Sequence, residues 1–350
     1  MMMRRYSPIG LDIRSGSVGV AQLVRTSRGV RTHRMASFPL VSEGGIEAQV
    51  EQVSELLDRR GYVGRRCVIA APRGAVRSGV VSVPRTADVG AINAIARSEL
   101  ARTHELDPGA FEMVCWGLPA AAGAREERAG VLACACPHEA IMPMIECFER
   151  AGIQIEAVDL VSQATARACL RASGNRNGML RVILDLGWTQ TMLIVVLGET
   201  VLYERVVSEG ALLHVHEAVQ RALSLDAGET DRALFGLGMT GFKEQPGARA
   251  AKVRSILEEY AGVIAGELSM SIDYAARRNG VGDEGEALLI GPGGSVPGID
   301  QRLADSCGLD VRVITPRVAL GDEGEDRELD NPALVVAVGL AERFEGGAWH

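Results

Sequence analysis

The sequence lacks most features that would place the protein in a membrane or on a nucleic acid. Aromatic residues make up only 4% of the 350 residues, so aliphatic side chains and alanine must build the core. No uninterrupted apolar run approaches the roughly 18 residues that span a bilayer, and the first residues lead into a strand pattern without an apolar signal core. The formal net charge of -8 disfavours general nucleic-acid binding and direct adhesion to anionic lipid.

Metal-binding and nucleophilic motifs are also missing. The seven cysteines are scattered, apart from Cys134 and Cys136 in an alternating apolar run, and no cluster of histidine and cysteine has zinc spacing. No histidine has a serine, cysteine or acidic partner at the spacing of a catalytic triad, and neither a Walker A motif nor a dinucleotide fingerprint is present. We therefore expect a reduced, cytoplasmic protein that uses another kind of site.

Two segments of the chain share one strand–turn–strand pattern. In each, an apolar strand ends in an aspartate, a turn of small or hydroxylated residues follows, and a second apolar strand begins. Such turns let backbone N–H groups approach phosphate oxygens, and the aspartate can hold Mg²⁺ through water. Either segment alone is an ordinary hairpin, but the two together favour a nucleotide cleft between related halves. The candidate residues are Asp12, Arg14, Ser15, Gly16 and Ser17, then Asp185, Gly187, Thr189, Gln190 and Thr191, with Asp12 and Asp185 as the magnesium ligands.

A strand at 287–290 runs into a glycine-rich turn, which is the third candidate element. The turn either lets adenosine pack against bare backbone or only joins a strand to a helix. Glu267 lies in a helix expected over 249–279 and is either an acceptor for ribose hydroxyls or a solvated residue. Gln163 either orients an attacking water or lies on a helix surface. The turn residues proposed to contact the nucleotide are Gly291, Gly293, Gly294 and Ser295.

The remaining pattern predicts two α/β halves, one of them interrupted. Strands near 8–14, 17–25 and 30–39 open the first half, and strands at 181–185, 192–197 and 201–207 open the second. An α-β-β-α block interrupts the first half, the turn 173–178 is the hinge candidate, and the acidic segment 321–330 is expected to be loose. The expected domains are 1–84 with 151–175 and 331–350, then the insert at 85–150, then 176–330.

This ordered series resembles the actin-like (ribonuclease H-like) ATPase superfamily, and within it the PilM family of type IV pilus assembly proteins, relatives of the cell-division protein FtsA. The similarity covers nearly the whole chain, and the inserted block is similar to the 1C subdomain of FtsA and PilM. The resemblance implies a duplicated α/β fold that binds ATP and Mg²⁺ between its halves. The similar segments are 10–23, 152–168, 185–191, 267–274, 291–298 and 331–341.

The same resemblance implies a cytoplasmic adaptor that is peripheral at the inner membrane through its partner and does not insert directly. In the family, a groove takes the cytoplasmic N-terminal peptide of the membrane protein PilN, and the adaptor connects this layer to the pilus motor ATPase or platform protein. We expect the groove between the helix near 50–57 and the inserted block. A type II secretion platform, whose parts resemble those of the pilus, is a variant of this prediction.

The first loop departs from the family pattern. Gly usually follows the aspartate and Lys ends the loop, whereas Arg14 and Gly19 stand here. The basic residues that usually follow the long-helix glutamate are replaced by Leu268, Ser269 and Met270. Arg14 could pair with phosphate or obstruct the loop. These departures predict that ATP binding is weakened or lost, and that the protein is at most a weak ATPase.

Two other functional classes use this fold. A small-molecule kinase would need a general-base aspartate beside a substrate pocket, and the sequence offers no convincing one. A filament-forming division protein like FtsA would carry a membrane helix after a linker, and residues 341–350 are too short and polar for one. The adaptor is therefore the preferred prediction.

Overall fold

In the computed structural model the chain divides into two compact units. The first comprises the chain up to Ala164, residues Arg278–Gly280 and the chain from Val336 onward, and the second comprises Thr165–Arg277 and Val281–Val335. The inserted block belongs to the first unit. The structure describes residues 5–27, 29–40, 45–120, 127–174, 178–240, 247–282 and 285–343.

The first unit is built on a mixed sheet whose strand order is β4-β3-β2-β5-β9, with β1 also paired to β3. The hairpin strands pair antiparallel, and β5 and β9 join β2 in parallel, as expected where helical connections return the chain to the same sheet edge. The strands are β1 (Arg5–Tyr6), β2 (Ile9–Arg14), β3 (Ser17–Thr26), β4 (Gly29–Pro39), β5 (Arg66–Ala70) and β9 (Gln154–Asp159).

The second unit repeats the same order as β12-β11-β10-β13-β14. Again three antiparallel strands open the sheet and two parallel strands complete it, which confirms the predicted duplication. Every residue of β10 is buried, as is typical of a strand covered on both faces. The strands are β10 (Leu180–Leu186), β11 (Thr191–Leu197), β12 (Thr200–Val207), β13 (Gly285–Ile290) and β14 (Asp310–Val313).

Helices cover these sheets with apolar faces spaced at three and four residues. In the first unit, α1 (Gly45–Arg59) and α3 (His138–Arg150) share one core with the sheet. In the second unit, α7 (Ala248–Asn279) buries such a stripe along its whole length. The other helices are α4 (Val161–Ser173), α5 (Leu212–Leu223), α6 (Ala227–Asp231), α8 (Ile299–Cys307), α9 (Pro316–Leu320) and α10 (Val335–Ala341).

Two glycines bring α10 into backbone contact with its neighbours in the first unit. A Cβ atom at Gly10 on β2 would collide with the carbonyl oxygen of Ala337, and one at Gly339 would collide with the carbonyl oxygen of Ala164 on α4. No residue larger than glycine fits either place without moving the backbone. The division between the units falls within α4 and at the first residue of α10, so the chain passes between them there.

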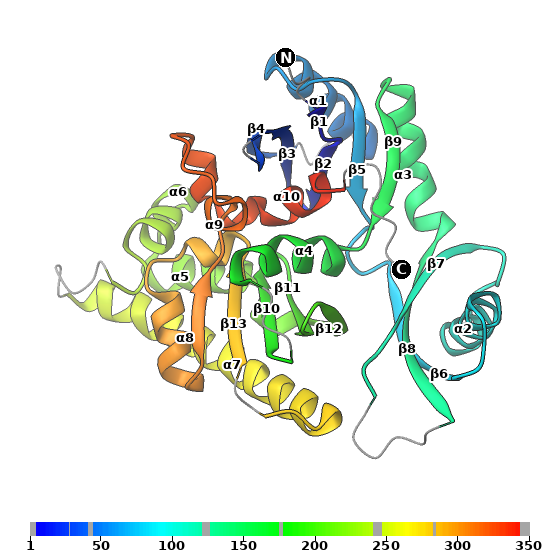
Figure 1. Ribbon diagram of the computed structural model, residues 1–350. Coiled ribbons are helices and arrows are strands. Elements are labelled where there is room, and N and C mark those ends of the chain that lie inside the picture. Colours follow the sequence, from blue (N-terminus) through cyan, green and yellow to red (C-terminus); the bar gives the residue numbers. More distant parts are fainter. Residues whose placement is uncertain are drawn as a thin grey trace. The chain divides into compact units, whose positions relative to one another are not determined.

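The inserted block, predicted as α-β-β-α over 85–150, is observed as a three-stranded antiparallel sheet with α2 (Val89–His104) on one side (Figure 1). A strand before residue 85 joins this sheet, and α3 packs in the core of the first sheet instead. Asp88 caps this helix by accepting a hydrogen bond from the amide of Ala91 at 2.7 Å. Val81, Leu100 and Phe111 lie in the core between helix and sheet. The strands are β6 (Arg77–Pro84), β7 (Phe111–Gly117) and β8 (Arg128–Pro137), in the order β6-β8-β7.

The predicted elements differ from the observed ones in a few places. The acidic segment 321–330 is not loose, because Arg317 donates to both carboxylate oxygens of Asp330 and to two backbone carbonyls, while Leu329 is buried. The predicted helix 229–234 is observed as the short α6, continued by a π-helical turn, η2 (Arg232–Leu237). Of the predicted hinge 173–178, residues 175–177 lie outside the described residues, as do 344–350 of the polar C-terminal segment.

Candidate functional site

The first candidate loop is a two-residue hairpin turn in the first unit. Arg14 and Ser17 pair across it, and Ser15 and Gly16 are exposed between them, with Gly16 at φ +85°. Asp12 and Arg14 are two residues apart on β2, so their side chains lie on the same face of the strand and can contact each other. Arg14 Nε donates to Asp12 Oδ2 at 2.6 Å.

A second arginine, which the sequence analysis missed, reaches the same carboxylate. Arg73 follows β5 and is 61 residues from Asp12, and its Nη2 lies 3.3 Å from Oδ1 and 3.5 Å from Oδ2. The Asp12 side chain is fully buried, and the Arg14 and Arg73 side chains are 11% and 13% exposed. The loop thus carries a compact cluster of two guanidinium groups around one carboxylate.

The second candidate loop joins β10 to β11 in the second unit and is held by the start of α5. The amides of Leu212 and Leu213 donate to the carbonyl oxygens of Gly187 and Trp188 at 3.1 and 2.8 Å. These amides would otherwise be unsatisfied at a helix N-terminus. A Cβ atom at Gly187 would collide with the carbonyl oxygen of Gln190, so this turn requires glycine.

Thr191, a predicted phosphate contact, is fully buried in the structure. Its hydroxyl donates to the carbonyl oxygen of Gly210 at 2.6 Å. Burial raises the pKa of Tyr260 on α7 far above its ordinary value. Thr191 therefore ties β11 to the 3₁₀ turn η1 (Ser208–Gly210).

The glycine-rich turn lies directly against the second loop. A Cβ atom at Gly291 (φ +81°) would collide with the carboxylate of Asp185, and one at Gly293 would come within 2.6 Å of Leu186 Cβ. The amide of Gly291 donates to the carbonyl oxygen of Pro332 at 3.0 Å. The turn forms the 3₁₀ helix η4 (Pro292–Ser295), in which Gly294 is buried and Ser295 is exposed. Close packing against β10 is therefore enough to explain why Gly291 and Gly293 are glycines.

Glu267 does not join this group in the structure. Its carboxylate forms an ion pair with Arg205 on β12, and Arg205 also donates to Ser271 Oγ at 3.2 Å. In the sheet order, β11 and β10 separate β12 from β13, which carries the glycine turn. Gln163 is half-buried on α4 in the first unit. The structure thus brings Asp185, Gly187, Gly291 and Gly293 together, and separately Asp12 to Ser17.

The second loop also contacts a histidine that the sequence offered no signal to find. The rings of Trp188 and His216 meet edge to face with centroids 5.1 Å apart, and His216 Nε2 lies 3.2 Å from Asp231 Oδ1. His216 belongs to α5 and Asp231 to α6. The loop, the first turn of α5 and α6 are therefore coupled by side chains as well as by backbone.

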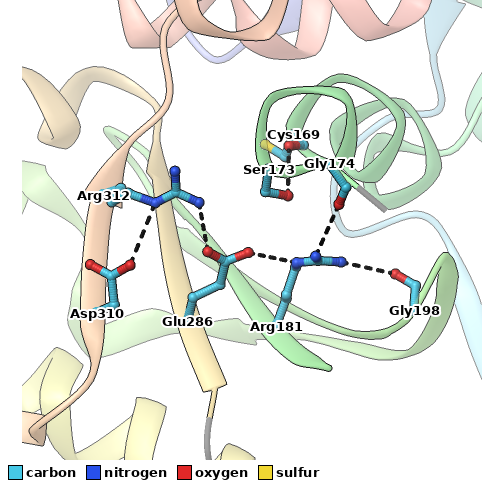
Figure 2. Close-up of polar contacts among 8 residues, drawn as sticks. All are labelled: Cys169, Ser173, Gly174, Arg181, Gly198, Glu286, Asp310 and Arg312. Carbon is cyan, nitrogen blue, oxygen red and sulfur yellow. Dashed lines mark hydrogen bonds and ion pairs between the residues drawn. The ribbon is translucent and has the colours of Figure 1, made fainter. Parts of the chain in front are cut away.

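A buried ionic cluster lies at the opposite end of the same sheet (Figure 2). Arg181 Nε donates to Glu286 Oε1 at 2.6 Å, and Arg312 Nη2 donates to Oε2 at 2.6 Å. Arg181 also donates to the carbonyl oxygens of Gly174 and Gly198. Arg181 and Glu286 are each only 1% exposed. The cluster joins β10, β13, β14, the β11–β12 turn and the residue after α4.

The helix α1, which is expected to border the partner groove, turns its apolar side chains into the core. Val50, Val53 and Leu57 are buried in one core with Ile141 and Phe148 of α3. Apolar surface is instead exposed on the face of the inserted sheet that α2 does not cover. There Val80 of β6 and Val114 of β7 are 44% and 48% exposed, on either side of the central strand β8.

The second loop offers a donor to a phosphate group, and the first loop fits a phosphate group better than a magnesium ion. In the second loop, the buried Gln190 Nε2 makes no hydrogen bond within the described residues, so it could donate to an anion. In the first loop, both oxygens of Asp12 already accept from guanidinium groups. Among the described residues, no three His, Cys, Asp or Glu side chains are grouped to hold a metal ion.

Comparison with known structures supports the fold. A PilM-PilN type IV pilus biogenesis complex is similar with a TM-score of 0.75 and 21% identity, over 96% of this chain and 98% of that one. The ethanolamine utilization protein EutJ from Carboxydothermus hydrogenoformans has a TM-score of 0.55 at 13% identity, over 97% and 90%. MreB 5 of Spiroplasma citri bound to AMPPNP has a TM-score of 0.51 at 11% identity, over 96% and 94%. The duplicated actin-like fold predicted from sequence is confirmed.

Family comparison covers almost the whole chain. No curated protein matches the sequence. In the part of the chain that the structure describes, no helix is both long and apolar enough to cross a bilayer. The model of the type IV pilus assembly protein PilM family matches residues 10–344. The chain therefore belongs to the PilM family of type IV pilus assembly proteins.

Proposed function

We propose that this protein is a cytoplasmic adaptor of a type IV pilus assembly platform, held at the inner membrane by the N-terminal cytoplasmic segment of a PilN-like protein. The family match over residues 10–344 is the observation that carries the proposal. The similarity to a chain of a PilM-PilN type IV pilus biogenesis complex supports the choice of partner. A type II secretion platform is the alternative setting.

The partner peptide would dock on the face of the inserted sheet that carries Val80 and Val114. Apolar side chains grouped on an exposed face are typical of protein–protein interaction sites. Both belong to edge strands, so an extended peptide could also add main-chain hydrogen bonds there. The buried side chains of α1 do not offer this opportunity, because α3 already covers them.

Binding of a labelled peptide tests this docking surface. The peptide carries the cytoplasmic N-terminal sequence of the PilN-like protein from the same organism, and fluorescence anisotropy reports its Kd. Val80→Glu and Val114→Glu should each weaken binding about tenfold or more, because each places a charge where an apolar contact is buried. Val89→Glu is the matched control, since Val89 is 74% exposed on α2.

One result would contradict the docking surface and another the adaptor role. Equal peptide affinity of the wild type, the Val80 variant and the Val114 variant would remove the proposed surface. Normal pili in a strain that lacks the protein would remove the role itself. A loss of secretion with intact pili would instead assign the protein to the secretion platform.

ATP is the proposed nucleotide ligand of this protein. The unpaired donor of Gln190, the tight Gly187 turn and the basic first loop support this assignment. Calorimetry with ATP should detect binding by the wild type, and Asp185→Ala and Gln190→Ala should weaken it. We expect at most slow hydrolysis. No heat at millimolar ATP would make the protein a nucleotide-independent scaffold while leaving the peptide experiment intact.

A further inference from the structure

The cluster of Asp12, Arg14 and Arg73 has a charge pattern opposite to that of a metal site. Arginine stays protonated under all ordinary conditions, so the three side chains together carry a formal charge of +1. A magnesium site needs carboxylate oxygens that are free to hold the ion or its water shell. Here each Asp12 oxygen already accepts from a guanidinium group. A divalent cation at Asp12 would also face two positive charges within a few ångströms, which is strongly repulsive in a buried place.

We infer that the first loop is a metal-independent phosphate site in which Arg14 and Arg73 supply the positive charge and Asp12 is their internal counter-ion. This inference rests on the proposed binding of ATP. Guanidinium groups present pairs of N–H donors that match phosphate oxygens. The Arg14 and Arg73 side chains are 11% and 13% exposed, so they are largely shielded from water, and charge-assisted hydrogen bonds there are strong.

The turn geometry lets an anion approach the backbone at this place. Ser15 and Gly16 are exposed at the tip of the hairpin, directly after Arg14. Gly16 has a positive φ and no side chain, so an anion can approach the backbone closely. Gly19 pairs with Asp12 across the hairpin and adds no side chain on that strand beside the carboxylate. Phosphate would compete with Asp12 for the two arginines.

Because of this competition, Asp12→Asn should change the Kd for ATP in opposite directions at an arginine phosphate site and at a magnesium site. If Asp12 holds the arginines, replacing its carboxylate by an amide should release them and lower the Kd for ATP several-fold. If Asp12 holds Mg²⁺ through water, the same change should raise the Kd for Mg-ATP. Arg14→Ala and Arg73→Ala should each raise the Kd about tenfold or more, since each removes a charge-assisted hydrogen bond.

The experiment is calorimetry on the full chain with ATP, in Mg²⁺ and in EDTA, with inorganic pyrophosphate as a second probe. The expected result is a similar Kd in both buffers, binding of pyrophosphate, and tighter binding by Asp12→Asn. Arg59→Ala is the control, because Arg59 is an exposed residue of α1 paired to Glu55. Thermal melts identify any variant that does not fold. If a variant does not fold, the Kd of the wild type for ATP in Mg²⁺ and in EDTA tests the inference by itself.

The outcomes separate this inference from the proposed function. ATP binding that disappears in EDTA, or that weakens in a folded Asp12→Asn, would overturn the metal-independent site and leave ATP binding standing. No binding of ATP or pyrophosphate in either buffer would overturn it as well. The adaptor role would survive both results if the PilN-like peptide still bound with wild-type affinity.

Discussion

At the scale of single residues, Gly10 shows how the absence of one methyl group sets a packing distance. Gly10→Ala should lower the free energy of unfolding by about 3 kcal/mol, because the added Cβ atom has no room beside Ala337 and the backbone must shift. Urea denaturation monitored by circular dichroism measures this change.

Gly266→Ala is the matched control for that substitution. Gly266 lies inside α7 with no atom within 4 Å of the position of an added Cβ. Alanine should therefore stabilise the helix there by about 0.5–1 kcal/mol. Equal effects of the two substitutions would mean that α10 does not pack on β2 as described.

Glu286 provides a second residue-scale prediction, on pH. Burial would raise the pKa of Glu286, but hydrogen bonds from Arg181 and Arg312 and their positive charges more than offset it, so the pKa lies below its ordinary value. A lowered pKa contributes stability that is fully present above the pKa of the unfolded chain, about 4.3. This stability is lost as the pH falls through the lower pKa of the folded state.

Glu286→Gln should cost about 3–5 kcal/mol at pH 7, since it leaves Arg181 buried without its counter-charge. The difference in unfolding free energy between wild type and variant should shrink as urea denaturation is repeated from pH 7 down to pH 3. Glu259→Gln, on the exposed side of α7, should change stability by less than about 0.5 kcal/mol. A difference that grows on acidification would contradict the assigned direction of the pKa.

At the scale of elements, Thr191 joins β11 to η1 through one hydroxyl. Thr191→Val should destabilise the second unit by about 1–3 kcal/mol, because the Gly210 carbonyl loses a buried hydrogen-bond partner. Thr191→Ser should recover most of this loss. Thermal unfolding of the three proteins gives the comparison, and a valine variant as stable as the wild type would show that this hydrogen bond does not stabilise the unit.

Most elements could be predicted from sequence because their patterns are local. The apolar stripe of α7 repeats every three to four residues, and the apolar residues of the hairpin strands repeat every second residue. Both repeats can be recognised within a short stretch of sequence. The ion pair of Glu267 with Arg205 could not be predicted, since 62 residues separate the partners and only the fold brings β12 beside α7. The contact of Arg73 with Asp12 could not be predicted for the same reason.

Contacts between residues that are distant in sequence matter more for the predicted site than for the fold, and local patterns do not reveal them. The two aspartates and glycine turns were found because each lies in a short motif. The motif did not contain what surrounds each carboxylate, which is guanidinium groups at Asp12 and Gly291 at Asp185. The acidic segment 321–330 was misjudged in the same way, because Arg317 holds it from outside.

At the scale of the whole molecule, the cysteines report on opening of the core. Burial raises the pKa of Cys67 to about 12, in part against the positive charge of Arg65. At pH 8 its thiolate therefore forms in only about 10⁻⁴ of molecules, and thiolate is the species that alkylating reagents attack. Brief labelling with iodoacetamide, followed by mass spectrometry, should leave Cys67 unmodified in the native protein and modify it fully in urea.

The half-buried cysteines are the internal reference for this labelling. Cys115, Cys136 and Cys307 should react before the buried Cys67 and Cys147. Modification of Cys67 at the same rate in native protein and in urea would show that the core of α1, α3 and the sheet opens readily. It would also remove the reason for excluding α1 from the partner surface.

The position of α10 bears on how the protein is made. Its residues are almost wholly buried, and it covers Gly10, which leaves the ribosome nearly a full chain length earlier. The strands of the first sheet are all synthesised by Asp159, but at typical elongation rates the covering helix follows only after a delay on the order of tens of seconds. During that delay the nascent first unit carries an apolar face without its cover, which is the kind of surface that chaperones bind.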